Sequence, residues 1–441
     1  MVSYILAIFL LKIYLINLRV KMKKLKIGIC GWGNVATGLF NTIESNNKFI
    51  KSNGNLEIEI VVIGARRDNP KCDPGAVKIE RDIFDVIDHD IDVVVELIGG
   101  VDVARDLILK SINKKKHVVT ANKAVLFHHG DEIFKEANSN GVKILFESSV
   151  CAGTPIIKLL TEELSANKVT KIAGMLNGTS NFILSNMEEG SDFKPTLELA
   201  QKEGYAEPDP TFDIEGMDAA HKIGILSSLA FGTPLPPDDF YIEGISKIEK
   251  IDFKYAKDMG FTIKHLAVSK LNQDKIELRA HPVLIKKDSY LANLKSVRNG
   301  IEVETDLLGT LHIAGSGAGQ ESTASGVISD LVNLANSNDN ILELDSNRNI
   351  ELVDFMSLSF QYYFYIESNI TPEAVEKITS IFAKKKIALE SIAHKEDSKE
   401  NISHIIVITD LFLERELEYL YENILNLESV NKIRSIRIES N

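Results

Sequence analysis

Short apolar runs alternate with amphipathic stretches in the first third of the chain. The apolar runs have the length and composition of buried strands, and they cover residues 26–30, 57–65, 91–97, 117–120 and 143–147. The stretches 37–45 and 103–115 between them have helical periodicity. Strands that alternate with helices indicate a parallel, doubly wound sheet. We therefore predict an α/β domain over residues 22–150.

The order of elements changes after residue 150. Helical patterns come first, from residue 154 and at 196–202, 216–231 and 252–259, and strand patterns follow at 261–270, 275–282, 300–306 and 309–314. This segregation predicts an α+β domain over residues 151–319. A glycine-rich loop then leads into an apolar-periodic helix at 320–335, which we expect to return to the first domain.

The last part of the chain is predicted to form a separate small domain. Asn, Ser and Asp are frequent in residues 336–349, which is typical of a linker. Beyond it the predicted order is strand 357–367, helix 372–384, strands 387–393 and 403–411, helix 413–425 and strand 433–438. This βαββαβ order predicts a ferredoxin-like fold over residues 350–441.

The composition is that of an ordinary globular protein. Of the 441 residues 44% are hydrophobic and 26% are charged. The 63 acidic and 50 basic residues give a formal net charge of -13, and this balance argues against nucleic acid as a partner. The three cysteines, Cys30, Cys72 and Cys151, have no CxxC spacing. The sequence therefore predicts no disulfide framework or Cys-rich zinc site, and it favours a reducing, cytoplasmic location.

The first twenty-one residues differ from the rest. Residues 4–18 are nearly all apolar apart from Lys12 and Asn17, which is shorter than the roughly 20 apolar residues of a bilayer helix. Neither a basic region before this run nor small residues at its end indicate a signal peptide. We expect residues 1–21 to be an extension outside the fold, with Met22 as the working start and no membrane partner; an anchor is the alternative.

A glycine turn connects the first predicted strand to the first helix. Gly31 and Gly33 have the spacing Gly-x-Gly-x-x-Ala, and glycines there allow the backbone to approach a pyrophosphate. This pattern predicts a Rossmann-type dinucleotide-binding domain, with a ligand-free glycine turn as the alternative. Arg66 and Arg67 follow the second strand, where NAD-binding proteins usually have an acid. Guanidinium groups suit a 2′-phosphate, so we predict NADP, with NAD and solvated loop charges as the alternative.

The most informative stretch holds six carboxylates in sixteen residues, from Glu203 to Asp218. Pro208 and Pro210 fix the loop that leads into a helix starting near residue 216. Asp218 and Lys222 are four residues apart and share a helix face, which by itself is typical of a surface ion pair. Carboxylates in a fixed pocket instead suit an ammonium-bearing substrate, and a lysine can donate a proton to a carbonyl oxygen as hydride arrives.

This stretch resembles the signature of the homoserine dehydrogenases, A-x3-G-[aromatic or aliphatic]-[small]-x2-D-P-x2-D-[aliphatic]-x-G-x-D-x3-K. Every defined position is filled, among them Ala200, Gly204, Asp209, Pro210, Asp213, Gly216, Asp218 and Lys222. The likeness extends over residues 92–100, 117–123, 147–155, 177–184 and 317–320. It implies a monofunctional NAD(P)-dependent enzyme that interconverts L-homoserine and L-aspartate 4-semialdehyde, in threonine, methionine and isoleucine biosynthesis.

The resemblance also implies roles for particular residues. Lys222 would exchange the proton with the substrate oxygen, and Lys123 would be a second active-site lysine near the nicotinamide. Glu207 would bind the amino group, with Asp213 and Asp218 completing an acidic wall. The implied cofactor contacts are Gly31, Gly33, Asn34, Val35, Arg66, Arg67, Lys123, Gly317 and Gly319.

A metal ion and an oligomer are implied by the same likeness. A monovalent cation, usually sodium, would be held by backbone carbonyls of Glu147, Val150, Ala152 and Thr154. Residues 151–319 would bind the substrate and form the contacts of a homodimer or homotetramer. The C-terminal domain resembles the ACT fold, but residues 368–373 lack the glycine of its usual ligand turn. We expect it to serve oligomerisation or structure rather than threonine feedback.

Two alternatives to this interpretation use the same domains. Cys151 would be the nucleophile of a phosphorylating, aspartate-semialdehyde-type dehydrogenase, although paired lysines have no place in that mechanism. A non-catalytic NADP-binding amino-acid sensor would not need a general acid. Among the histidines, His221 points about 100° away from Lys222 on the helix and is predicted to pack. His128 and His129 are expected in an exposed loop.

Overall fold

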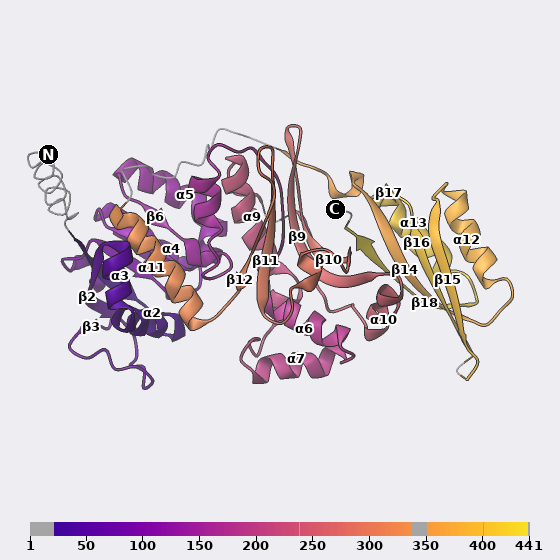
Figure 1. The fold of residues 1–441 in the computed structure, drawn as a ribbon, viewed down its shortest axis with the longest axis horizontal. Helices are drawn as coiled ribbons and strands as arrows, with labels where there is room; N and C mark the ends of the chain where they lie inside the picture. Colours follow the sequence, from indigo (N-terminus) through magenta and orange to yellow (C-terminus); the bar gives the residue numbers. More distant parts are fainter. Residues whose placement is uncertain (1–21, 238, 337–350, 400, 440–441) are drawn as a thin grey trace, which may run out of the picture. The chain divides into compact units, whose positions relative to one another are not determined.

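The computed structural model describes residues 22–237, 239–336, 351–399 and 401–439. The chain divides into two compact units (Figure 1): unit 1 combines Met1–Leu159 with Ala318–Leu344, and unit 2 combines Leu160–Gly317 with Asp345–Asn441. The predicted N-terminal extension, 1–21, and residues 337–349 of the predicted linker lie outside the described residues. Within the described part of the chain, no helix has the length and apolar character needed to cross a membrane.

Unit 1 is built on a six-stranded parallel sheet. Its strands are β1 (Lys23–Cys30), β2 (Leu56–Gly64), β3 (Lys78–Glu80), β4 (Val93–Glu96), β5 (His117–Thr120) and β6 (Ile144–Leu145). Their order is β3-β2-β1-β4-β5-β6, and every neighbouring pair is parallel. This is the order of a dinucleotide-binding fold, in which ligands bind beyond the carboxyl ends of β1 and β4, where the winding reverses.

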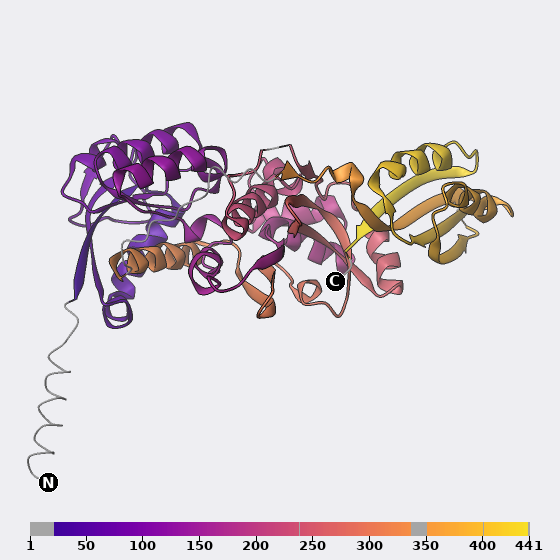
Figure 2. The ribbon, with the colours of Figure 1, turned by 90° about the horizontal axis from the view of Figure 1, so that it is seen from above.

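Helices cover both faces of this sheet (Figure 2). They are α2 (Asn34–Ser45), α3 (Asn47–Gly54), α4 (Asp102–Asn113), α5 (Lys123–Asn140) and α11 (Gln320–Asn336). Leu39 of α2 and Val327 of α11 pack in one core with β1 and β4, while Leu107 of α4 packs on the other face. A Cβ on Gly38 would lie 2.7 Å from the Gln320 carbonyl oxygen, so glycine allows α2 and α11 to approach closely.

Unit 2 contains one mixed sheet of twelve strands. Along its main path the order is β12-β11-β7-β9-β10-β18-β14-β16-β15. The strands are β7 (Val169–Met175), β8 (Tyr241–Ile242), β9 (Phe261–Asn272), β10 (Lys275–Lys286), β11 (Arg298–Thr305), β12 (Gly309–Ser316), β13 (Glu351–Leu352), β14 (Ser359–Asn369), β15 (Leu389–Asp397), β16 (Ile402–Thr409), β17 (Phe412–Leu413) and β18 (Val430–Ile438). The C-terminal strands continue the sheet because β18 pairs in parallel with β10, at Val283 and Leu284.

Seven helices flank this sheet among the described residues. They are α6 (Gly178–Glu188), α7 (Phe193–Lys202), α8 (Thr211–Ile214), α9 (Met217–Phe231), α10 (Lys250–Asp258), α12 (Ala374–Lys384) and α13 (Leu417–Leu425). Side chains of β14 alternate between two cores, as in any strand buried on both faces. Tyr362 and Phe364 pack with α12 and α13, whereas Tyr363 and Tyr365 pack with α6 and α10.

The coarse fold class is confirmed, but several elements differ from the sequence-based expectation. Strand β7 and helices α5 and α6 were not predicted. The expected loop around His128 and His129 is wrong, because both residues lie within α5. The period-3.6 signal of α5 is weak, since charged and small residues interrupt its apolar face.

Candidate active site

The glycine turn of unit 1 brings the end of β1 close to the segment after β4. Gly31 has a φ of 107°, and a Cβ there would lie 2.6 Å from the carbonyl oxygen of Leu97. Gly33 precedes α2, and a Cβ on it would meet nothing within 4 Å. The first residues of α2, Asn34 and Val35, therefore adjoin open space. Backbone N–H groups and the helix dipole favour a phosphate at such a terminus.

The loop after β2 carries the two predicted arginines, Arg66 and Arg67, and both are exposed. Asn69 fixes this loop on the glycine turn, because its Nδ2 donates hydrogen bonds to Trp32 O and Thr37 Oγ1, each at 3.0 Å. Asn69 was not predicted as a site residue. Its hydrogen bonds make the cationic loop and the glycine turn before α2 parts of one local structure.

A buried carboxylate organises the backbone next to Lys123. Glu96 ends β4, is fully buried, and accepts hydrogen bonds from Thr120 Oγ1 at 2.5 Å and Ile98 N at 2.8 Å. Burial raises the pKa of Glu96, although these hydrogen bonds act in the opposite direction. Asn122 caps α5, accepting from Val125 N at 3.2 Å, so Lys123 is the first helical residue. Glu96 was not predicted as a site residue, although a single acid at the end of an apolar strand is a recognisable signal in the sequence.

Lys222 of unit 2 lies on α9, nearly buried, and its amine is held by two acceptors. Nζ donates to Asp218 Oδ2 and to the carbonyl oxygen of Leu176, both at 2.7 Å. Leu176 O also accepts from Asn299 Nδ2 at 2.8 Å. The predicted i,i+4 pair is therefore a buried ion pair rather than a surface one. The position of the Lys222 amine therefore depends on Leu176, the residue that follows β7.

Asn177 joins the two aspartates. Its Nδ2 donates to Asp213 Oδ1 at 2.7 Å and to Asp218 Oδ2 at 2.8 Å, while its Oδ1 caps α6 by accepting from Ser180 N at 2.7 Å. The structure thus brings Asp213, Asp218 and Lys222 together. Asn177 was missed as a site residue, although an Asn-Gly pair before a helix is a recognisable capping signal.

Other predicted contacts lie outside this cluster. Glu207 is exposed, and among the described residues no hydrogen bond or ion pair of its carboxylate is present; its backbone oxygen accepts from Gln201 Nε2 at 3.2 Å. Gly317 packs against Asn299, whose Oδ1 would lie 2.1 Å from a Cβ. Gly319 has a φ of 127° and belongs to unit 1, as Lys123 does.

The predicted cation loop has an unusual backbone. Cys151 and Ala152 have φ values of 56° and 52°, a region that non-glycine residues rarely adopt. The Glu147 carboxylate accepts three backbone N–H groups, those of residues 156–158, at 2.8 to 2.9 Å. Thr154 Oγ1 is buried without a hydrogen-bond partner in the described residues. The side chain of Glu147 is therefore occupied by the backbone.

Comparison with known proteins gives a consistent result. Residues 155–332 match the family model described as homoserine dehydrogenase, and residues 31–147 match that of its NAD-binding domain. A homoserine dehydrogenase of Pseudomonas aeruginosa is 42% identical over 431 residues, 95% of this chain and 99% of the relative. The chain belongs to the homoserine dehydrogenase family. A homoserine dehydrogenase of Helicobacter pylori is 38% identical and covers 95% of this chain and all of its own.

Solved structures of homoserine dehydrogenases have the same fold. The crystal structure of the Thiobacillus denitrificans enzyme has a TM-score of 0.88 and 37% identity, covering 95% of this chain and 99% of its own. A hyperthermophilic archaeal homoserine dehydrogenase, solved with NADPH, has a TM-score of 0.60 and 25% identity, covering 70% of this chain and 97% of its own.

Membership of this family confirms the interpretation made from the signature, and it makes the protein a nicotinamide-dependent oxidoreductase. Neither alternative is favoured. Cys151 is fully buried, whereas a nucleophile that attacks an aldehyde must reach the substrate. His221 is buried with its ring 5.2 Å from that of Phe212.

Proposed function

We propose that this homoserine dehydrogenase interconverts L-homoserine and L-aspartate 4-semialdehyde with Lys222 as the proton-transfer residue. The observation that carries the assignment is the buried Lys222 amine held by Asp218 and the Leu176 carbonyl. Hydride would reach the aldehyde carbon, and the lysine would supply the proton to the oxygen that becomes the alcohol. In the oxidative direction the same amine would remove the proton. Lys123 is proposed as the second active-site lysine.

A substitution of the proposed proton-transfer residue tests this assignment. Lys222→Ala should lower kcat for homoserine oxidation by about 10²-fold or more, the usual scale for a positioned acid–base group. Reduced nicotinamide absorbance follows the rate, and circular dichroism checks the fold. Lys202→Ala, an exposed lysine in the last turn of α7, is the control. An unchanged rate for Lys222→Ala would contradict the proposed role.

The acidic cluster is proposed to bind the substrate amino group. Asp213 and Asp218 are held in place by the Asn177 amide, and paired carboxylates provide the charge that an ammonium group requires. Glu207 would add a third carboxylate from its exposed loop. This set selects an amino acid over a simple hydroxy acid.

NADP is proposed as the cofactor, and the residues fit it. Gly33 leaves the start of α2 open to a pyrophosphate, Gly31 allows the turn to lie against Leu97, and Arg66 and Arg67 offer guanidinium groups for a 2′-phosphate. The bound nicotinamide supplies or accepts the hydride. The archaeal relative solved with NADPH supports the same class. Equal kcat/KM with NAD and NADP would contradict the preference.

A monovalent cation, oligomerisation and a cytoplasmic location complete the proposal. Within the described part of the chain Thr154 Oγ1 has no hydrogen-bond partner, and the backbone is left-handed at Cys151 and Ala152. Both features fit a loop shaped around an ion, and backbone oxygens of Glu147, Val150, Ala152 and Thr154 would hold sodium there. Removal of sodium and potassium should then lower activity. Size-exclusion chromatography with light scattering tests the dimer or tetramer.

The C-terminal residues, from 351 onward, are proposed to form an ACT-like domain. The order β14-α12-β15-β16-α13-β18 is that of a ferredoxin-like fold. The turn between β14 and α12 lacks the usual glycine. We therefore propose a structural or oligomerisation role, and strong inhibition by millimolar threonine would contradict it.

A further inference from the structure

A short segment of unit 2 lies against the turn 213–218, which carries Asp213 and Asp218. Residues 241–245, here called the tether segment, begin with β8, which pairs with β10 at Arg279 and Ala280. At the other end of the segment, Ile245 N donates to Ile214 O at 2.8 Å. A Cβ on Gly244 would lie only 2.4 Å from that same oxygen. The residue next to Asp213 therefore rests directly on the tether segment.

His265 connects the tether segment to the start of α9. Its Nε2 donates to the carbonyl oxygen of Glu243 at 2.9 Å, and burial lowers the pKa of this imidazole. Gly216, the residue before α9, has a φ of 87°, and a Cβ there would lie 2.9 Å from His265 Nε2. Both ends of the turn 213–218 thus contact the tether segment or the histidine bound to it.

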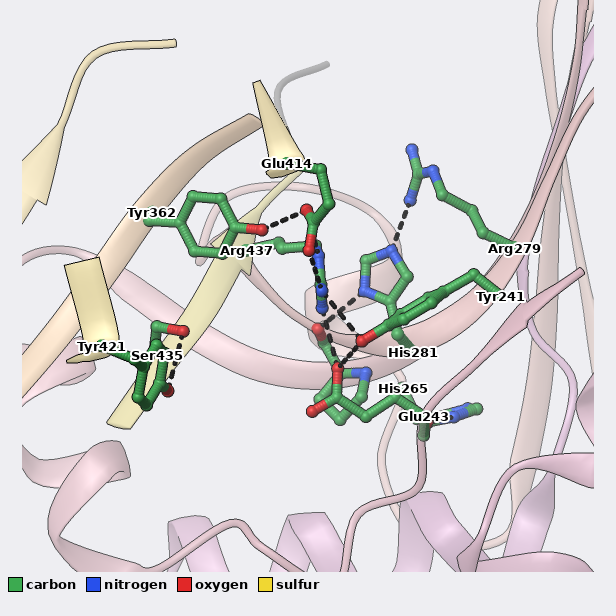
Figure 3. Close-up of polar contacts among 11 residues, drawn as sticks. Tyr241, Glu243, His265, Arg279, His281, Tyr362, Glu414, Tyr421, Ser435 and Arg437 are labelled. Atoms are coloured by element: carbon green, nitrogen blue, oxygen red, sulfur yellow. Dashed lines mark hydrogen bonds and ion pairs between the residues drawn. The ribbon is translucent and has the colours of Figure 1, made fainter. Parts of the chain in front are cut away.

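Arg437 of the last strand, β18, holds the tether segment from the C-terminal side (Figure 3). Its guanidinium donates to Glu243 Oε2 and to Tyr241 Oη, each at 2.8 Å. Tyr241 Oη donates in turn to Glu243 Oε2 at 2.8 Å. Arg437 Nε and Nη2 also donate to Glu414, at 3.1 and 2.6 Å, and Glu414 accepts from Tyr362 as well.

Burial makes these contacts strong and also shows which of them can be changed. The side chains of Arg437 and Glu414 are 6% and 5% exposed, and removing Arg437 would leave the Glu414 carboxylate as an uncompensated buried charge. The Glu243 side chain is 28% exposed. Its removal leaves Arg437 paired with Glu414, so a variant at Glu243 is expected to fold.

We infer that Arg437 and Glu243 are positioning residues for the substrate site, through which the C-terminal region holds the turn 213–218. The inference rests on the proposed roles of Asp213, Asp218 and Lys222. Arg437 binds the Glu243 side chain, and the tether segment binds the backbone of Ile214. The backbone oxygen of Glu243 in turn holds His265 against Gly216. Loss of the ion pair displaces the carboxylates that bind the ammonium group and leaves the cofactor-binding turn of unit 1 unchanged.

The test compares steady-state constants of full-length Glu243→Ala with those of the wild-type enzyme. KM for homoserine should rise about fivefold to tenfold, the scale of coupling between residues in one hydrogen-bond network. KM for NADP should stay within about twofold, because residues that share no partners with Glu243 are only weakly coupled to it. Glu243→Gln keeps an oxygen that accepts from Arg437 and Tyr241, so it should restore most of the affinity for homoserine.

Glu249→Ala provides a matched control. Glu249 also pairs with β18, through Lys432 and through Arg434 at 2.7 Å. It lies at the start of α10, and among the described residues its carboxylate has no hydrogen bond or ion pair with the tether segment. Its loss should lower the melting temperature without raising KM for homoserine. An unchanged KM in Glu243→Ala, or an equal rise in Glu249→Ala, would overturn the inference.

Failure of the inference and failure of the proposed function have different signatures. If Lys222→Ala is inactive but Glu243→Ala keeps its KM, only the positioning role is wrong. If Lys222→Ala retains full turnover, the proposed site itself is wrong, and any effect of Glu243→Ala must be explained in another way.

Discussion

The residues that follow β7 supply two groups that shape the proposed substrate site. The carbonyl oxygen of Leu176 accepts from Lys222 and Asn299, and the next residue, Asn177, binds both aspartates. One dipeptide therefore positions the amine and the carboxylates together. Because Oδ1 of Asn177 caps α6 at the same time, the side chain has a single orientation.

Asn177→Asp tests the amide of this side chain. The variant keeps an oxygen for the α6 cap, but it replaces the donor to Asp213 and Asp218 with a third negative charge. Charge-assisted hydrogen bonds are worth roughly 1.5–3 kcal/mol, so kcat/KM for homoserine should fall about tenfold or more. Asn186→Asp is the control, because the Asn186 side chain lies in α6 and donates to the Phe182 carbonyl of the same helix. Full activity of Asn177→Asp would exclude this role.

Glu96 makes the stability of unit 1 depend on pH. Its folded-state pKa is raised above the ordinary value of 4.5 by burial, so its contribution to stability is present below that value and is lost as the pH rises through the raised pKa. Glu96→Gln stays neutral. Its free energy of unfolding relative to wild type should therefore increase as the pH rises from about 4.5 through the raised pKa of Glu96, as measured by denaturant titration.

Glu57→Gln is the control for this pH dependence. The Glu57 side chain is 43% exposed and Lys51 lowers its pKa, so its stabilising contribution appears above the unfolded-state pKa and the variant should show a small difference of opposite sign. A difference for Glu96→Gln that is independent of pH would contradict the raised pKa.

The charged residues of the proposed site could be predicted from the sequence, but the neutral residues that hold them could not. Lys222, Asp213 and Asp218 were predicted because carboxylates and a lysine at this spacing imply chemistry. Asn177 and Asn69 carry no charge, and their partners lie more than thirty residues away in the sequence. Their roles depend on tertiary contacts, which the local pattern does not contain.

At the scale of elements, the two glycines before α2 are expected to have different roles. Gly31→Ala places a Cβ 2.6 Å from Leu97 O at a φ of 107°, which should cost about 1–3 kcal/mol of stability. Gly33→Ala has space for its methyl group and a φ of -90°. It should keep the melting temperature and instead raise KM for NADP, because the methyl group occupies the phosphate approach. Equal destabilisation by both changes would contradict this assignment.

Element types were predictable where periodicity was strong. The strand, glycine turn and helix at the start of unit 1 were identified, because apolar runs and glycine spacing determine them locally. Strand β7 was missed because Thr170, Lys171 and Gly174 interrupt its apolar run. The strand order of the mixed sheet was also out of reach, since β18 pairs with β10 across about 150 residues of chain.

At the scale of the molecule, the C-terminal region is expected to unfold together with the rest of unit 2. Strands β10 and β18 are hydrogen-bonded, and Tyr363 and Tyr365 share a core with Phe253 of α10. Calorimetry of the cofactor-free protein should therefore show no separate transition for residues 351–439. Limited proteolysis during heating gives an independent check. A stable C-terminal fragment that melts alone would contradict it.

Helix α11 follows β1 by almost three hundred residues in the sequence. Its residues Ala324, Val327 and Leu331 nevertheless complete the core around β1. During translation the N-terminal strands leave the ribosome long before this helix exists. The apolar surface that α11 covers in unit 1 therefore stays exposed until about three quarters of the polypeptide has been synthesised. A chaperone that shields nascent apolar surface should bind this intermediate, and ribosome stalling before residue 320 should prolong that contact.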